Sequence, residues 1–119
     1  MDRNLSDREI EIDDLSERFN QSHQIDLTVL PKGAKIVILT GNSTYWIELV
    51  YPPKGKVKAS GGIFNESGKD SVITYIIGSQ LSGKDVKNLQ LIVGMNCLFE
   101  NNIVTSPIQK LFIEPMNLK

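Results

Sequence analysis

Residues 35–51 read KIVILTGNSTYWIELVY, and this stretch decides the fold class. An apolar run at 35–40 is followed by the turn sequence Gly-Asn-Ser at 41–43 and by a second run of large side chains at 44–51. Gly and Asn tolerate positive φ, so the turn is tight. Two such runs joined by a short turn predict a pair of antiparallel strands.

The same pattern recurs along the rest of the chain. Further strands are predicted over 56–60, 71–77, 89–93, 96–100, 103–106 and 108–114. Short strands at intervals of roughly 8–12 residues are typical of a sandwich or a small barrel. The sequence therefore predicts an all-β fold, a small barrel or sandwich of about seven short strands with one short N-terminal helix.

The composition points to the same fold class. The chain has 119 residues, with 14 Ile and 8 Val but only two Ala. β-branched side chains lose χ1 freedom in helices and pack well on pleated sheets. One domain of this length buries roughly 65% of its unfolded surface, which is enough for a single core.

Charge divides the chain into two parts. Residues 1–26 contain eight acids and three Arg, whereas residues 27–119 contain six acids and ten Lys, which gives −5 and +4. We expect an acidic N-terminal arm at 1–26, with a helix over 14–22, and a β-domain at 27–119. The arm either folds onto the basic body, or each part is solvated by its own charges, since surface charges interact weakly beyond a Debye length of ~8 Å.

The residue counts remove several functional classes. The single cysteine, Cys97, excludes an internal disulfide framework and a multi-cysteine zinc site, and the single histidine, His23, excludes a histidine-rich metal centre. No apolar run approaches the ~20 residues of a membrane span, and the polar first ten residues do not match a secretory signal. We expect a cytoplasmic protein with no membrane contact and no cofactor.

Catalytic motifs do not stand out either. Cys97 lies in an apolar run at 95–99 that is typical of a core strand, and free Cys is usually buried. The sequence has no Gly-x-Ser-x-Gly, paired-histidine or phosphate-loop motif. We therefore expect a protein that is not an enzyme.

Small polar residues gather at four predicted turns. Small hydroxyl groups beside glycine backbone can bind a polar ligand or an anion, although the same residue types are also the ordinary chemistry of turns. The candidate ligand-binding residues are Asn42, Ser43, Tyr45, Gly62, Ser79, Thr105 and Ser106.

A lysine row gives an alternative surface. On an extended strand, the alternating residues Lys54, Lys56 and Lys58 project to one face at a spacing of ~6–7 Å, which suits a phosphate backbone. Trp46 could add base stacking, as in single-strand binders. The other interpretation is a solvent-facing edge strand whose lysines block aggregation. The pI of about 5.8 counts against a nucleic-acid module.

Two of the predicted strands, at 36–39 and 72–77, are apolar on both faces. Such strands are usually covered on both sides, here by the N-terminal helix or by another subunit. Trp46 is either an exposed interface anchor or packs under that helix, against Leu15 or Phe19. We expect a self-associating, homo-oligomeric binding or assembly module.

The turn sequences, taken in order, also resemble a known set of proteins. TGNSTY at 40–45, GGIF at 61–64, GS at 78–79 and TSPI at 105–108 resemble short, uncharacterised bacterial proteins with the pattern T-x-N-S-x-Y … G-G-x-F … G-S … T-S-P-V/I. The similarity covers residues 27–113. It implies membership of that family, with no activity attached, and directs attention to the same turn residues.

Overall fold

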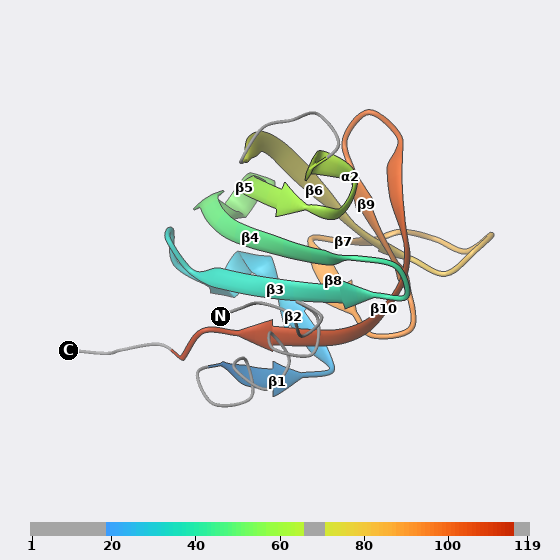
Figure 1. Ribbon diagram of the computed structural model, residues 1–119, viewed down its shortest axis with the longest axis horizontal. Helices are drawn as coiled ribbons and strands as arrows, with labels where there is room; N and C mark the ends of the chain where they lie inside the picture. The colour runs from blue at the N-terminus through green and yellow to red at the C-terminus, as the bar shows by residue number, and fades with distance from the viewer. Residues whose placement is uncertain (1–18, 66–70, 116–119) are drawn as a thin grey trace, which may run out of the picture.

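The computed structural model describes residues 19–65 and 71–115, in which strands predominate (Figure 1). The strands are β1 (Asn20–Ser22), β2 (Gln24–Asp26), β3 (Lys35–Thr40), β4 (Thr44–Tyr51), β5 (Lys56–Gly61), β6 (Val72–Gln80), β7 (Lys87–Asn88), β8 (Gln90–Ile92), β9 (Asn96–Phe99) and β10 (Ile103–Ile113). The short helices are η1 (Leu27–Val29), η2 (Pro52–Lys54) and α2 (Gly62–Asn65).

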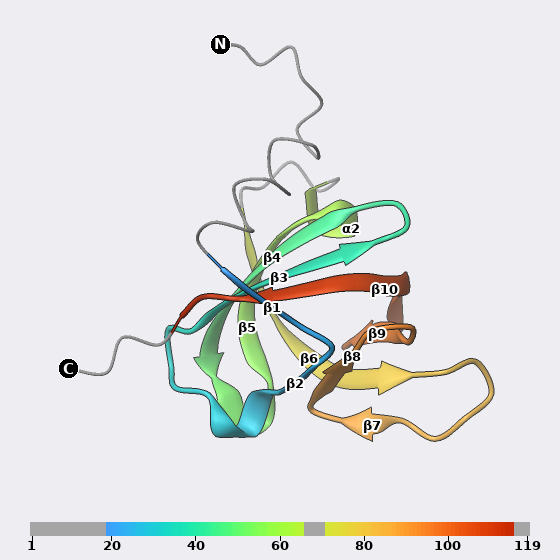
Figure 2. The ribbon, with the colours of Figure 1, turned by 90° about the horizontal axis from the view of Figure 1, so that it is seen from below.

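Six of these strands close into an antiparallel barrel. Strands β3, β4, β5 and β6 pair in sequence order, β6 then pairs with β9, β9 with β10, and β10 returns to β3 (Figures 1 and 2). Closure removes the open sheet edges that a sandwich would keep. The all-β prediction is confirmed, and of its two forms the structure is the barrel.

The hairpin formed by β3 and β4 supplies one wall of the core. Ile36 lies opposite Ile47 and Ile38 lies opposite Tyr45 in the register of the two strands. All four side chains are buried, because alternate residues of β4 point into the barrel. The apolar side chains whose spacing predicted the hairpin are therefore the ones that fill the interior of the barrel.

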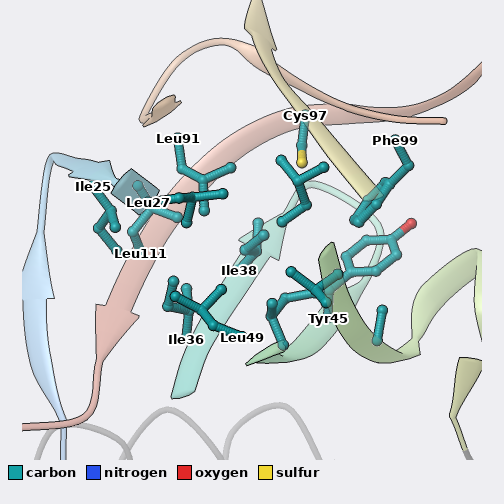
Figure 3. Packing of buried hydrophobic residues seen from close by; sticks show 14 of the residues in the cluster. Ile25, Leu27, Ile36, Ile38, Tyr45, Leu49, Leu91, Cys97, Phe99 and Leu111 are labelled. Atoms are coloured by element: carbon teal, nitrogen blue, oxygen red, sulfur yellow. The ribbon is translucent and has the colours of Figure 1, made fainter. Parts of the chain in front are cut away.

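The interior is packed along its whole length (Figure 3). At one end Leu27 of η1 and Leu91 of β8 lie together, both fully buried. At the other end the rings of Tyr45, Phe64 and Phe99 form an aromatic cluster, with centroids 4.8 Å apart for Phe64 and Phe99 and 6.0 Å apart for the other two pairs. Phe64 reaches this cluster because the single turn of α2 folds it over the end of the barrel.

A second, smaller apolar cluster lies on the outside of the barrel. Val37 of β3 and Phe112 of β10 are register partners, and with Leu39 they are almost fully buried. Phe19 and the half-buried Trp46 pack against them. Trp46 is therefore packed against an apolar cluster of the barrel wall, while the helix expected to cover it, with Leu15, lies outside the described residues up to position 18.

Several local predictions are wrong. The predicted helix at 14–22 lies outside the described residues up to position 18, and its last residues form β1, because their backbone pairs with β10. The strand predicted over 71–77 is longer, since β6 runs to Gln80 and β7 pairs with its last residues. The break expected at Pro107 is instead a register shift within the continuous strand β10. The helical turn α2 was not predicted.

Residues 20–26, grouped with the acidic arm by sequence, form β1 and β2. These strands pair with β10 and β8, respectively. The described part of the arm is therefore hydrogen-bonded to the body through its backbone. Of the acids assigned to the arm, the described residues include Asp26, which caps η1 by accepting the N–H of Thr28 at 2.9 Å.

The buried thiol of Cys97 predicts how stability depends on pH. Burial raises the pKa of Cys97 from 9.0 to about 12, so the folded state keeps a proton that the unfolded chain loses. The contribution of this thiol to the free energy of unfolding is fully present below pH 9. It is lost as the pH rises from 9 toward 12. Between pH 8.5 and 10.5, urea unfolding of the natural chain should lose about 2 kcal/mol more than that of Cys97→Ala. Equal losses in the two chains would contradict this expectation.

Candidate functional site

Three turns that are distant in sequence meet at one end of the barrel and enclose a pocket of about 340 Å³. The turns are the β3–β4 connection, the junction of β5 with α2, and the bend of β10 near Pro107. The residues that line this rim pocket are Thr40, Asn42, Ser43, Tyr45, Gly62, Ile63, Val104, Thr105 and Ser106. Six of the seven residues proposed from sequence as ligand-binding therefore lie together.

The first turn is fixed by the side chain of Thr40. Its Oγ1 accepts the backbone N–H of Asn42 at 3.3 Å and that of Ser43 at 3.1 Å, and its hydroxyl donates to the Ser43 carbonyl at 3.2 Å. Thr40 is 1% exposed, so these bonds form away from water. Thr40 holds the backbone of the turn, so the side chains of Asn42 and Ser43 are left to line the pocket.

A side-chain hydrogen bond joins the first turn to the third. Asn42 Nδ2 donates to Ser106 Oγ at 2.7 Å, across 64 residues of sequence. Asn42 Oδ1, the Ser106 hydroxyl proton and the Ser43 hydroxyl have no hydrogen bond to the rest of the described chain. An amide oxygen accepts and a hydroxyl group both donates and accepts, so the pocket offers groups of both kinds.

The second turn packs on the ring of Tyr45. The N–H of Ile63 donates to Tyr45 Oη at 3.3 Å, and the tyrosine side chain is 2% exposed. Gly62 has a φ of +50°, and a Cβ built on it would overlap the ring carbons of Tyr45. Glycine is therefore required here both for its backbone conformation and for the close approach of the ring.

The third turn is anchored by Thr105. Its Oγ1 accepts the N–H of Cys97 at 3.1 Å and donates to the Ser106 carbonyl at 2.6 Å, while Asn96 Nδ2 donates to the Thr105 carbonyl at 2.7 Å. Thr105 is buried, so its hydroxyl group is a structural element of the pocket wall. Ser106 is the residue of this pair that presents a hydroxyl group to the cavity.

The rim pocket is electrically neutral and amphiphilic. None of its described lining residues is a carboxylate, an amine, an imidazole or a guanidinium. Two aliphatic side chains flank the polar groups, Ile63 at 39% exposure and Val104 at 50%. Neither residue belongs to the polar clusters of the sequence, because both side chains are apolar.

Ser79, the seventh candidate, lies elsewhere. Its side chain is fully buried; the hydroxyl donates to the Gln90 carbonyl at 2.7 Å and accepts the N–H of Ile92 at 3.2 Å. The hydroxyl group thus fastens β6 to β8. The polar pair Gly78-Ser79 resembled a ligand-binding turn in the sequence, but it lies inside β6.

The lysine row is not a single row. Lys54 belongs to η2 and is followed by Gly55 with a φ of +76°, so only Lys56 and Lys58 lie on β5. Lys58 and Trp46 line a groove of about 380 Å³ on the outside of the barrel. The carboxylates of Glu48 and Glu114 line the same groove and balance the charges of Lys35 and Lys58, so its described lining offers no net positive charge to a phosphate.

The part of the chain that the structure describes contains no group of three or more His, Cys, Asp or Glu side chains placed to hold a metal ion. It also contains no helix with the length and apolar character needed to span a membrane.

The contact between Gly62 and Tyr45 predicts a matched pair of stability changes. Gly62→Ala combines a left-handed backbone with overlap of the tyrosine ring, and should cost about 3 kcal/mol. Gly33→Ala has a φ of +89° but open space around it, and should cost about 1 kcal/mol. Urea unfolding of the two variants measures the difference. Equal costs would show that the ring contact is unimportant.

No protein-family model matches this chain, and no curated protein and no solved structure gives a significant match.

Proposed function

We propose that the chain is a non-enzymatic binding module whose rim pocket takes a small, uncharged, polar ligand that carries hydroxyl or amide groups. The observation that carries this function is the convergence of three sequence-distant turns on one cavity, joined by the bond from Asn42 to Ser106. Small-molecule sites typically combine apolar walls with a few placed polar groups. The rim pocket has both, and its volume of about 340 Å³ suits a small molecule.

The hydrogen-bonding groups of the pocket favour a neutral ligand over an anion. An anion site in a turn depends on free backbone N–H groups or on cationic side chains. The N–H groups of Asn42 and Ser43 are already donated to Thr40, and that of Ile63 to Tyr45. With no lysine among the described lining residues, little would balance a negative charge.

The free groups instead match a ligand that both donates and accepts. Asn42 Oδ1 can accept from a ligand hydroxyl or amide, and the hydroxyl groups of Ser43 and Ser106 can donate to or accept from it. Ile63 and Val104 can cover an apolar part of the ligand, such as the C–H face of a polyol. Burying an uncharged polar molecule here costs far less desolvation than burying an ion.

The lining residues also support a binding role rather than a catalytic one. General acid–base catalysis uses groups whose pKa lies near neutral pH, and nucleophilic catalysis uses an activated side chain beside a base. The described lining residues supply neither carboxylate nor imidazole nor thiol. Cys97, the one thiol, is fully buried within the barrel and its raised pKa of about 12 keeps it protonated.

The proposal also includes membership of a bacterial family and a cytoplasmic location. The turn sequences that resemble the bacterial set with the T-x-N-S-x-Y pattern include most of the pocket lining, so we expect the pocket to be shared by that set. A cytoplasmic location agrees with a lone free cysteine, since disulfides are rare there. Single-stranded nucleic acid is the less supported alternative, because Lys54 and Lys56 do not line the groove of Trp46.

Thermal unfolding with a panel of ligands tests the proposed function. Neutral polyols, monosaccharides and small amides are compared at millimolar concentration with their phosphorylated or carboxylated counterparts. A ligand that binds only the folded state at 100 times its Kd stabilises it by about 2.7 kcal/mol, so a neutral ligand should raise the Tm by several degrees.

Matched variants locate the site. Asn42→Ala and Ser106→Ala should abolish the ligand-induced shift, whereas the exposed Asn88→Ala and Ser82→Ala should keep it. A shift that survives in the first two variants would place binding elsewhere. Stabilisation by the charged counterparts alone would contradict a neutral ligand.

A further inference from the structure

A groove of about 380 Å³ lies on the outside of the barrel, over β3, β4 and β5, which run side by side (Figure 1). Its described lining shares no residue with that of the rim pocket. The volume falls within the range of small-molecule sites, and the lining combines apolar side chains, hydroxyl groups and charges of both signs. The groove therefore has the size and composition of a second binding site, separate from the rim pocket.

The charged side chains of the groove form one row across neighbouring strands. Glu48 of β4 is the register partner of Lys35 on β3 and of Lys58 on β5. On the far side of β3, the N–H of Glu114 donates to the Lys35 carbonyl at 3.0 Å. Residues that face each other across two strands lie about 5 Å apart, with their side chains on the same side of the sheet. The row therefore alternates in sign, from carboxylate to amine to carboxylate to amine.

This row points out of the barrel. Ile36, Ile47 and Val57 are buried in the core, and each is the sequence neighbour of one charged residue of the row, which alternation places on the opposite face. None of the four charged side chains forms an ion pair with the described chain, although all four line the groove. Two cations and two carboxylates give no net charge, yet each of them is left to pair with a group of a ligand.

The apolar part of the groove lies one step further along the same strands. Trp46 is two residues from Glu48 on the outer face of β4, a distance of about 7 Å. Its register partner is Val37 of β3, and Phe19 packs against the same apolar cluster. Trp46 is half-buried and lines the groove, so part of its ring is open to a ligand. The groove is thus charged at one end and aromatic at the other.

We propose that this groove binds a free α-amino acid with an apolar side chain. The ligand's carboxylate pairs with Lys35, its ammonium group pairs with Glu48, and its side chain lies on the ring of Trp46. An α-amino acid carries both charges on one carbon, which suits a lysine and a glutamate on register partners about 5 Å apart. A charged head and an apolar tail in one small molecule match the two ends of the groove.

The charge pattern argues against other small ligands. A phosphate or a dicarboxylate would meet Glu48 and Glu114 as well as the lysines, and an amine without a carboxylate would meet Lys35 and Lys58. An uncharged ligand would displace water from the charged groups without pairing with them, which costs free energy. A zwitterion offers a group of opposite charge to each sign.

Fluorescence of Trp46, the only tryptophan of the chain, tests the groove directly. With the full chain, L-phenylalanine and L-leucine should change its emission saturably, and isothermal titration calorimetry gives the Kd. Two blocked ligands are the controls: N-acetyl-L-phenylalanine lacks the ammonium charge and L-phenylalaninamide lacks the carboxylate. Each should bind at least about tenfold more weakly than L-phenylalanine, because it has lost one charge-assisted hydrogen bond.

Variants assign each charge to its residue. Lys35→Gln should weaken the binding of L-phenylalanine about tenfold and leave that of L-phenylalaninamide, which has no carboxylate, unchanged. Glu48→Gln should weaken L-phenylalanine by about the same factor and leave N-acetyl-L-phenylalanine unchanged. Lys110→Gln, at an exposed position of β10 outside the described lining, is the matched control and should bind as the natural chain does. Far-UV circular dichroism checks that each variant is folded.

The amino-acid site would be overturned if neither fluorescence nor calorimetry detects binding at millimolar concentration. Blocked ligands that bind as tightly as L-phenylalanine would also overturn it, without the use of any variant. So would binding that Lys35→Gln and Glu48→Gln leave intact. A Trp46 that acrylamide does not quench and that no amino acid affects would show that residues 1–18 or another chain fill the groove instead. None of these results bears on the rim pocket, since its lining is separate.

Discussion

The barrel depends on the hydrogen bonds that β10 forms along both of its edges. This strand pairs with β3 on one side and β9 on the other, and it is the element that turns a meander of strands into a closed wall. Pro107 lies in the middle of it and has no N–H to donate, and the pairing register shifts beside it on both edges. The strand that closes the barrel is therefore also the strand whose pairing is irregular. The irregular segment is also where Ser106 meets Asn42, so the rim pocket is a product of barrel closure.

Much of the fold could be predicted because its central hairpin is local. The predicted strands at 35–40 and 44–51 have the bounds of β3 and β4, since apolar alternation and a Gly-Asn turn specify both ends. Prediction failed where tertiary contacts override local preference. The polar residues 20–22 resemble a helix end in sequence, yet they form β1 because β10 offers an unpaired edge. The helical turn α2 could not be predicted, because it begins at the pair Gly61-Gly62 and paired glycines indicate a bend.

The candidate site shows the same limit. Local chemistry identified the hydroxyl-rich turns, but which turns meet depends on strand order, which no local pattern contains. Asn42 and Ser106 are brought together by the pairing of β10 with β3. Ser79 was misassigned for the related reason that its glycine neighbour sits in a strand. The aliphatic walls formed by Ile63 and Val104 could not be separated from core residues before the barrel was known.

The strand order also has a consequence for synthesis of the protein. The edge of β3 that β10 will occupy is made early, and about seventy residues must follow before its partner exists. During translation, β3, β4, β5 and β6 can form a curved sheet, but this sheet cannot close until Ile113 has left the ribosome. Until then an apolar strand presents unpaired N–H and C=O groups to other nascent chains. The interval between β3 and β10 is thus the period in which the chain is most exposed to aggregation, and in which a chaperone that shields strand edges would help it most.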